Sequence, residues 1–453
     1  MNLVNNNFIY CTGYQIQISI NFQLNMTFKK NNKKIISAWT MYDWANSVYP
    51  LVITSAIFPI FYEATTNETI TFFGVDFVNT ELYSYVISLS YLIVAFLSPL
   101  LSGIADYSGN KKSYMRFFCY LGALSCMSFY FFDAAHIEIS MVSVLLGSIG
   151  FSGSLVFYNA YLPEIATVDL HDKVSAKGFS RGYIGSSSLL IICLLLIMVL
   201  KVPAKWAFVL TGLWWIGFSQ ITFRGLPSNI YNHKPTGNKL TKGFGELKKV
   251  WKQMSGNKSL KRYLAAFFTY SMGVQTIMLM AVFFGTKEIS WVEGEMETGL
   301  IISILVIQFI AVAGAYLMAF ISKKIGNIKT LGIVVFIWAI ICIVAYTFVY
   351  TPLHFYLIAA AIGFVMGGIQ SLSRSTYSKL LPETEDHTSY FSFYDVLEKM
   401  GIVIGTFFFG FIEGMFSIRE SVLMLIVFFI IGFILLLRVP KTEALKGAAE
   451  IWT

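Results

Sequence analysis

YNAYLPE at residues 158–164 and YSKLLPE at residues 377–383 are two copies of one pattern, separated by 219 positions. Two other pairs of markers recur in the same order at offsets of 217 to 220 positions. These pairs are DYSG at 106–109 with KKIG at 323–326, and Gly182 and Gly185 with Gly401 and Gly405. Three markers in one order at nearly one spacing indicate an internal duplication. We therefore predict a chain built of two related halves.

Apolar segments surround these markers from one end of the chain to the other. Of the 453 residues, 56% are hydrophobic and only 13% are charged, which is too few charges to cover water-soluble domains. Each segment of about 20 apolar residues can cross a hydrocarbon core of roughly 30 Å as a helix. Helices are expected because the bilayer offers no water to backbone groups, and the segments lack the alternation of barrel strands. The sequence predicts an all-α membrane protein of about twelve transmembrane helices, about six in each half.

A polar segment at 225–262, rich in Lys, Gly and Asn, separates the two halves. The predicted organisation is, in chain order, a cytoplasmic tail at 1–36, an N-terminal six-helix half at 37–224, a basic cytoplasmic linker at 225–262, a C-terminal six-helix half at 263–437 and a cytoplasmic tail at 438–453. Residues 1–25 carry no charge and no signal-peptide pattern, whereas four lysines lie between Met26 and the first span. We therefore expect translation to begin at Met26, with 1–25 a mis-assigned start.

The net charge of +8 is distributed by loop. The odd-numbered loops between the predicted spans hold only four of the 33 Lys and Arg residues, namely Lys201, Lys205, Lys287 and Arg419. All the others lie in the two tails, in the even-numbered loops or at the adjoining helix ends. This asymmetry is the positive-inside pattern, which places both termini in the cytoplasm. The basic balance therefore reflects membrane topology, and no nucleic-acid partner is expected.

Other patterns that carry chemistry are missing from the sequence. The five cysteines are scattered, and the histidines near span ends form no ligand pattern, so we predict neither a disulfide framework nor a metal site. The sequence has no phosphate-binding loop or nucleophile pattern, which argues against ATP drive and against an enzyme. We expect no cofactor, and a monomer whose partners are the lipid bilayer and a small-molecule substrate.

The segment SGIADYSGNKK at 102–112 follows the second predicted span. Its acid at a helix end, its glycine turn and its two lysines resemble the loop motif of the major facilitator superfamily. The resemblance implies the major facilitator fold and a cytoplasmic latch between helices, with Asp106, Lys111 and Lys112 as gate residues. Ordinary positive-inside charge beside a turn glycine is the alternative.

The loop motif departs from the family pattern at two positions. Ser102 stands where the leading glycine is usual, and the second copy has Lys323 in place of the acid. The second departure puts a latch in the C-terminal half in doubt.

The first predicted span contains WTMYDWANSVY at 39–49. Its polar residues recur at three- and four-residue steps and would share one helical face. They are Asp43, Asn46, Ser47, Pro50 and Thr54. An acid inside a span is a functional candidate by default, yet Asp43 would lie only roughly 9 Å deep at 1.5 Å per residue. Asp43 is therefore either a substrate or coupling residue or a latch residue, and Asn46 and Tyr49 are candidate cavity groups.

Further motifs resemble one branch of the superfamily. Span ten and its sequel contain GGIQSLSRS at 367–375 and YFSFY at 390–394. The other contributing segments are 39–49, 158–164 and 178–185. Together they are similar to the family that contains the autophagy-linked vacuolar amino-acid effluxers of fungi and many bacterial members, over residues 37–437. The resemblance implies export of neutral amino acids from fungal vacuoles and, for bacterial relatives, transport without a settled substrate.

Several polar residues of the later spans are candidates for the site or the gate. Arg374 can bind a substrate carboxylate through its planar fork, but its place at the end of span ten favours a gate role, paired with Glu383. Glu398 is the better proton-relay candidate, because Asp395 and Lys399 form a favourable i, i+4 pair. The remaining cavity candidates are Gln275 and Gln370, and the remaining gate candidates are Glu164 and Arg181. For the midspan polar residues Gln275, Asn159 and Gln308, interhelical hydrogen bonding is the alternative.

These observations predict a secondary active transporter that moves a small solute, such as a neutral amino acid, by alternating access. A cation-coupled sugar or peptide symporter and a membrane nutrient sensor that does not transport are the alternatives. The energy would come from a proton or sodium gradient or from the gradient of the substrate, with Asp43 and Glu398 as the coupling acids. Residue usage typical of an AT-rich genome and the short tails favour a bacterial inner membrane.

Overall fold

The computed structural model describes residues 28–233 and 238–440. The expected start at Met26, the segment 1–25 and the end of the chain from residue 441 lie outside this part.

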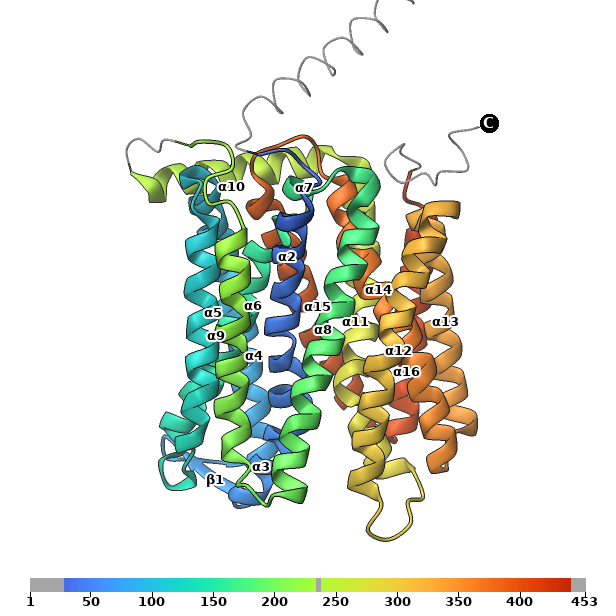
Figure 1. Cartoon of the computed structure of the whole chain (residues 1–453). Helices are drawn as coiled ribbons and strands as arrows, with labels where there is room; N and C mark the ends of the chain where they lie inside the picture. The colour runs from blue at the N-terminus through green and yellow to red at the C-terminus, as the bar shows by residue number, and fades with distance from the viewer. Residues whose placement is uncertain (1–27, 234–237, 441–453) are drawn as a thin grey trace, which may run out of the picture.

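Helices α2 to α9 pack around one hydrophobic core and form the first helix group (Figure 1). The α-helices of this group are α2 (Lys33–Asn46), α3 (Phe58–Thr65), α4 (Asn79–Ser108), α5 (Lys111–Ser128), α6 (Ile137–Asn159), α7 (Leu162–Ile165), α8 (His171–Leu194) and α9 (Lys205–Gly225). Between them lie two π-helical segments, η1 (Tyr49–Ala56) and η5 (Leu195–Val199), and three 3-10 turns, η2 (Phe129–Phe131), η3 (Ala134–His136) and η4 (Val168–Leu170).

Helices α11 to α16 surround a second core and form the second helix group. Their bounds are α11 (Lys258–Glu288), α12 (Met296–Ile325), α13 (Asn327–Phe348), α14 (Pro352–Leu380), α15 (His387–Met415) and α16 (Ile418–Leu437). Helix α10 (Lys239–Gly256) lies between the groups in sequence and runs across the ends of the long helices in space (Figure 1).

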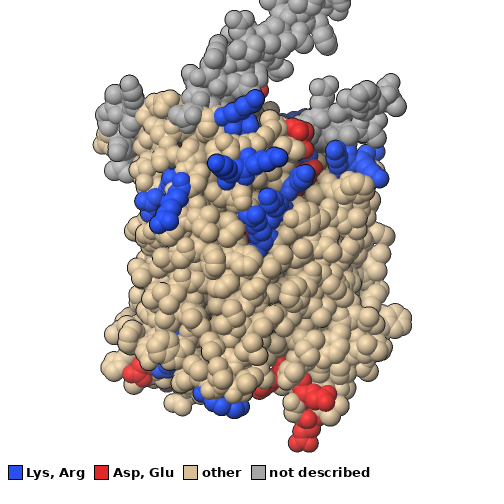
Figure 2. All heavy atoms as spheres, in the orientation of Figure 1, with Lys and Arg blue, Asp and Glu red and all other residues tan. Residues whose placement is uncertain are grey.

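The two ends of the molecule differ in structure and in charge. We call the end that carries α10 the α10 end. We call the other the hairpin end, because a short antiparallel hairpin of β1 (Thr69–Phe72) and β2 (Val75–Val78) lies there. Figure 2 shows Lys and Arg gathered toward the α10 end of the visible face, with an uncharged band below them. The sequence analysis did not predict this hairpin, which lies in an acidic loop.

Ten helical segments in the described residues are long and apolar enough to cross a membrane. They comprise segment 33–65, in which α2, η1 and α3 continue one another, and the segments built on α4, α6, α8, α9, α11, α12, α13, α14 and α16. Helices α5 and α15, like the linker helix α10, fall short of that apolarity. Helix α5 begins with Lys111 and Lys112, and α15 carries Asp395, Glu398 and Lys399. The count that hydropathy supports is therefore ten, against about twelve predicted.

Pro50 interrupts the regular helix that the sequence predicted for the first span. Helix α2 ends at Asn46, and the π-helical segment η1 begins at Tyr49. Proline removes a backbone donor and its ring clashes with the preceding turn, so the chain widens locally to accommodate it. This break lies beside the cavity described below.

Local sequence signals set several helix ends. The Asn257 side chain accepts a hydrogen bond from the Leu260 N–H at 3.0 Å and so caps α11. Helix α4 ends at Gly109, whose φ of +65° is a left-handed conformation that glycine adopts without strain. This glycine turn points the chain from α4 into α5 and holds Asp106 near the helix end.

Candidate functional site

A cavity of about 310 Å³ lies between the two helix groups. Such a volume falls within the range of small-molecule sites. All six residues expected at the substrate or coupling site line it, namely Asp43, Asn46, Tyr49, Gln275, Gln370 and Glu398. The midspan residues Asn159 and Gln308 also line it. The structure thus brings these side chains together, and their roles in transport stay predictions.

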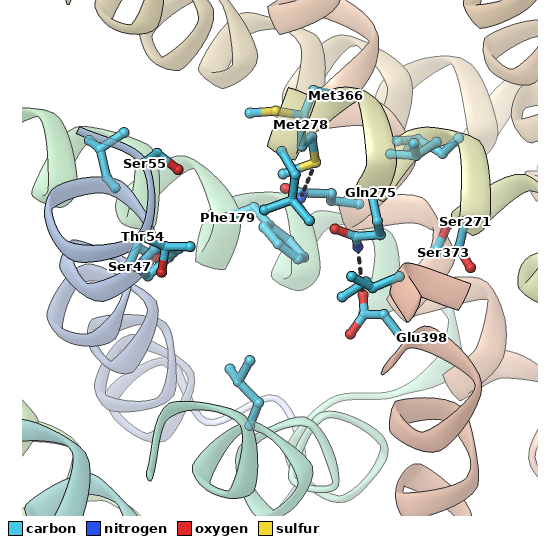
Figure 3. Close-up of a pocket in the computed structure, with 18 of the residues that line it drawn as sticks. Ser47, Thr54, Ser55, Phe179, Ser271, Gln275, Met278, Met366, Ser373 and Glu398 are labelled. Carbon is cyan, nitrogen blue, oxygen red and sulfur yellow. Dashed lines mark hydrogen bonds between the residues drawn. The ribbon is translucent and has the colours of Figure 1, made fainter. Parts of the chain in front are cut away.

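One wall of the cavity carries small polar side chains, and the opposite wall carries longer polar side chains. Figure 3 shows Ser47, directly after α2, and Thr54, from η1, across the cavity from Gln275 and Glu398. The Gln275 side chain donates to Glu398 at 3.0 Å (Figure 3). Aromatic rings and methionines such as Met278 complete the lining. The result is an apolar chamber with a few convergent polar groups, typical of a site for a small organic solute.

Two buried polar groups of the lining have no hydrogen-bond partner among the described residues. They are Nδ2 of Asn46 and Oγ of Ser152, from α2 and α6. A buried donor without a partner costs about 1–3 kcal/mol. Both residues line the cavity, although these two atoms are buried in this conformation, and Ser152 is a lining residue that was not predicted from the sequence.

An ion pair between Asp43 and Arg374 joins the two helix groups beside the cavity. Nη2 of Arg374, on α14, lies 3.2 Å from Oδ2 of Asp43, on α2, and both side chains are almost fully buried. The hydroxyl of Tyr158 donates to the same carboxylate oxygen at 2.6 Å. Glycine is required nearby, since a Cβ on Gly178 would lie 2.2 Å from that oxygen.

The guanidinium of Arg374 is held on every side. Ser175 accepts from it through its hydroxyl and its backbone carbonyl, both at 3.0 Å, and Asn159 accepts at 3.2 Å. The rings of Trp39, Tyr158 and Phe179 lie within cation–π range, with the Phe179 centroid nearest at 4.1 Å. Arginine suits this place because its planar fork serves several acceptors at once.

The expected pairing of Arg374 with Glu383 is wrong. Glu383 lies exposed in the loop after α14, whereas Arg374 points into the interface between the helix groups and pairs with Asp43. The physical reason is the direction of the side chain, since Arg374 is buried a turn and a half before the end of α14. The position of Asp43 is compatible with both roles that the sequence left open, because it lines the cavity and also pairs across the helix groups, and these roles stay predictions.

Asp395, Glu398 and Lys399 form a compact charged cluster on α15. Nζ of Lys399 lies 3.5 Å from Asp395 and 3.4 Å from Glu398. Asp395 and Lys399 are buried, whereas about a quarter of the Glu398 side chain is exposed. Two carboxylates thus share one ammonium group, and Glu398 is the one that faces the cavity.

Gln370 contacts the first helix group directly. Its side-chain oxygen accepts from the hydroxyl of Tyr183, on α8, at 2.5 Å, and its amide lies 3.4 Å from Sδ of Met278. The side chain therefore both lines the cavity and joins α14 to α8.

At the α10 end, Asp106 caps a helix of the other group. Its carboxylate accepts from the backbone N–H groups of Thr388 and Ser389 at 3.1 and 2.7 Å, and from the Ser389 hydroxyl at 2.7 Å. These groups belong to the first turn of α15. A carboxylate at a helix N-terminus satisfies free N–H groups and meets the positive end of the helix dipole.

Glu164 and Lys111 form a second contact at the same helix. They make an ion pair in which Glu164 is fully buried, and Nδ1 of His387, the first residue of α15, lies 3.3 Å from the Glu164 carboxylate. The pair therefore joins α5 and α7 to α15.

Lys112 and Arg181 bond only within the first helix group. Lys112 donates to the carbonyl of Leu226 at 2.7 Å. Arg181 donates to Thr40 at 2.7 Å and to Ser37, which connects α8 to α2. The structure thus gives these two gate candidates no contact across the groups among the described residues.

The sequence analysis missed a buried network around Asp172. Its carboxylate, in the first turn of α8, accepts from Lys379 at 2.6 Å, from Asn327 at 2.7 Å and from the Ser322 hydroxyl at 2.9 Å. The three donors lie on α14, α13 and α12, so the network joins the helix groups. The network lies at the end of α12, in the C-terminal half, where the departure at Lys323 put a second latch in doubt.

The internal repeat explains this network. Asp106 and Lys323 are 217 positions apart, and so are Asp172 and Ser389. In the first copy the acid, Asp106, lies near the end of α4, and its partner Ser389 lies in the first turn of α15. In the second copy the acid, Asp172, lies on α8 and contacts Ser322 near the end of α12. The Asp172 network therefore lies at the position of a second latch, with the acid on the other helix, and its role as a latch stays a prediction. The repeat offset applied to both partners of the first latch leads to Asp172 and to Lys323, the neighbour of its partner Ser322.

His233 completes the contacts at the α10 end. Its Nδ1 lies 2.7 Å from the backbone carbonyl of Asp106 and its Nε2 lies 2.7 Å from the Glu385 carboxylate. Both partners are acceptors, so the ring must carry both protons. The hydrogen bond to Glu385 raises the pKa of His233, and burial opposes it.

We expect this contact to be pH-dependent. Because the folded-state pKa is raised above its usual value of about 6.5, the stabilisation is complete below about pH 6.5 and is lost as pH rises through the raised pKa. The melting temperature of the purified protein should therefore fall between mildly acidic and mildly alkaline pH. His233→Gln should remove this part of the pH profile, and an unchanged profile would contradict the assignment.

Comparisons with known proteins agree with this architecture. Residues 31–449 match the family model described as vacuole effluxer Atg22 like. A protein of Bacillus subtilis (strain 168), described as the uncharacterized MFS-type transporter YxiO, is 30% identical over 417 residues, which cover 89% of this chain and 94% of that protein. Autophagy-related protein 22 of Pichia angusta is 25% identical over 425 residues, which cover 79% and 75%.

Solved structures show the same fold at low identity. The proton:xylose symporter XylE matches with a TM-score of 0.69 and 10% identity, covering 91% of this chain and 97% of that one. The transporter FucP in its outward conformation matches with a TM-score of 0.63 and 14% identity, covering 90% and 98%. At such identities the likeness establishes the fold alone, which is that of the major facilitator superfamily.

Proposed function

Because the chain belongs to the vacuole effluxer Atg22-like family of MFS-type transporters, we propose that it is a secondary active transporter that moves a small solute by alternating access. As a member of this family it is a membrane transporter and not an enzyme. The observation that carries the proposal is the cavity between the helix groups, closed toward the α10 end by bonds that join the groups. Proteins of this fold rock two such groups about a midplane site.

The proposed topology has twelve spans, six in each half, with both termini in the cytoplasm. It includes α5 and α15, because each contacts other long helices and because Lys111 of α5 and Asp395 and Lys399 of α15 form buried ion pairs. The helix groups then correspond to the predicted halves at 37–224 and 263–437, and the α10 end is the cytoplasmic end. The asymmetry of Lys and Arg supports this orientation. The bacterial relative favours the plasma membrane as the location, and we keep a monomer as the working unit.

The structure corresponds in this scheme to a state closed on the cytoplasmic side. Among residues 28–233 and 238–440, the hydrogen bonds between the two helix groups lie at the α10 end or beside the cavity, and they include those of Asp43, Asp106, Asp172, Ser175 and Tyr183. The solute would then enter from the hairpin end. Transport requires these bonds to break and re-form in each cycle.

A neutral amino acid is the proposed class of solute. The family model described as vacuole effluxer Atg22 like matches residues 31–449, and the cavity combines an apolar lining with polar side chains such as Gln275 and Gln370. Sugars and small peptides are the second class, since polar groups line both walls of the cavity. A nutrient sensor would bind one of these solutes without moving it.

A flux assay in proteoliposomes tests the proposal. Labelled amino acids, sugars and dipeptides are offered at two pH values, with and without a sodium gradient. Sustained uptake of a neutral amino acid above protein-free liposomes is the expected result. Uptake of sugars or peptides alone would transfer the proposal to the symporter alternative, and binding without uptake would support a sensor.

Glu398 is the proposed proton carrier, because it faces the cavity and shares Lys399 with Asp395. Glu398→Gln should abolish pH-driven accumulation yet leave solute exchange at equal pH, since glutamine can still accept the hydrogen bond of Gln275 but cannot carry a proton. Counterflow and pH-jump uptake separate the two activities. Glu293→Gln, in an exposed loop at the hairpin end, is the matched control, and full pH-driven accumulation by Glu398→Gln would remove Glu398 from the coupling step.

A further inference from the structure

Helix α10 has an apolar surface that the protein does not cover. One face is buried, with Gly243, Val250 and Met254 against the rest of the molecule. Phe244 and Trp251 lie two turns apart on another face and are 56% and 57% exposed. Large apolar side chains in water on an amphipathic helix call for a partner.

Lysines flank this exposed surface. Lys242, Lys248 and Lys252 are all exposed on the same helix. Lys249 is different, because it is bound to Asp386 at 2.7 Å and to Glu246 at 3.0 Å. The free face of α10 therefore combines aromatic side chains with three cationic side chains that extend from the protein.

The position of α10 along the long helices indicates the environment of its exposed face. A Cβ on Gly103 would lie 2.3 Å from the carbonyl oxygen of Gly243, so α10 touches α4 at that point. Gly103 precedes the end of α4 by five residues, or about 7.5 Å. Trp251 packs on Phe393 with ring centroids 5.3 Å apart, and Phe393 lies about 9 Å inside α15. Helix α10 thus contacts α4 and α15 within about 9 Å of their ends and runs across the long helices (Figure 1).

We propose that α10 is an interfacial helix that binds anionic lipid headgroups. At this depth a helix crossing the spans lies at the boundary between headgroups and acyl chains. Phe244 and Trp251 then insert into the boundary, and Lys242, Lys248 and Lys252 bind lipid phosphates. Charge and apolar surface both fit an anionic bilayer, with each lysine near such a surface adding roughly fivefold in affinity.

The same helix connects the lipid to the latch at α15. Lys249 pairs with Asp386, and Gln253 accepts from the hydroxyl of Tyr390 at 3.1 Å. Asp386 and Tyr390 flank the first turn of α15, which Asp106 caps. Lipid that holds α10 in place therefore supports the closed arrangement of α4 and α15.

Site-specific depth measurement tests the insertion. In liposomes, a nitroxide label replaces Phe244 in one full-length variant and Gly245 in another, with the native cysteines changed to serine. The label at 244 should collide mainly with oxygen and the label at the neighbouring exposed position 245 mainly with a water-soluble relaxing agent. Equal access of both labels to the water-soluble agent would overturn the proposal and point to a soluble partner for this face.

Energy transfer tests the choice of lipid. A donor on Ser255→Cys, at the end of α10, is measured against acceptor-labelled phosphatidylglycerol and acceptor-labelled phosphatidylcholine. The wild-type background should favour phosphatidylglycerol by at least about twofold, and Lys242, Lys248 and Lys252→Gln together should remove that preference. The control changes the exposed Lys323, Lys324 and Lys329 to Gln at the same end of the molecule. No preference in the wild-type background, or equal loss in the control, would overturn the assignment to α10.

Discussion

Arg374→Gln is expected to abolish solute accumulation while the protein remains in the membrane. The substitution leaves Asp43 buried beside the cavity without its cation, and breaking such a pair costs about 3–5 kcal/mol. This cost falls on the arrangement closed at the α10 end, so the population of that arrangement should drop by about 100-fold or more. Uptake into proteoliposomes, normalised to reconstituted protein, measures the loss.

A matched control and a double variant separate gate from binding site. Arg262→Gln removes an arginine that bonds only within the second helix group, to the carbonyl of Arg438, and should transport normally. Asp43→Asn with Arg374→Gln removes both charges at nearly constant volume, so the melting temperature should recover. If the pair is only a gate, the double variant regains flux. If Asp43 also acts in the cavity, flux stays lost. Normal accumulation by Arg374→Gln alone would contradict both roles.

Exchanging the charges of Asp172 and Lys379 should restore the transport that either single change removes. Each single substitution places two like charges side by side in a buried site, at a cost of at least about 3–5 kcal/mol in the closed arrangement. In the exchanged pair, Ser322 and Asn327 can reorient, because a hydroxyl and an amide both donate and accept. Initial uptake rates of Asp172→Lys, Lys379→Asp and the exchanged double variant provide the test.

The exchange also needs a control for local disruption. Lys173, the next residue on α8, is exposed, and Lys173→Asp should leave uptake within about twofold of wild type, because exposed charges contribute little. If the exchanged variant transports no better than the single variants while its melting temperature is restored, the reversed latch has no part in the cycle.

The lining of the cavity was predicted better than the contacts of the gate, because all six cavity candidates line the cavity whereas Lys112 and Arg181 bond within the first helix group and Glu383 does not pair with Arg374. Asp106, a glycine turn and two lysines carry a strong local signal, because capping α15 requires an acid at a helix end. Asp172 lacks such a signal, because its partner Lys379 lies 207 positions away. The acid also lies on α8, whereas the loop motif predicts an acid at the end of the helix that ends near position 323. Only the offset of the repeat connects the two latches.

The partner of Arg374 shows why sequence proximity misleads inside a bundle. Glu383 is nine positions away and Asp43 is 331 positions away, yet the latter is the partner. Helices of different halves meet side by side, and the depth of a side chain along its own helix decides its neighbour. The π-helical segment at Pro50 was also not predictable from the sequence. A proline predicts a break in a helix, but it does not predict that the chain widens into a π-helical segment.

A reversible cross-link at the α10 end tests the central claim most directly. Lys173 and Lys323 are exposed and follow Asp172 and Ser322, which bond across the helix groups at 2.9 Å. Cysteines at these two positions, joined by a short disulfide-containing linker, should stop flux in proteoliposomes and leave solute binding intact, and reduction should restore flux. Alternating access predicts this result because solute can leave only when the latches open. Full flux through quantitatively cross-linked protein would contradict the account.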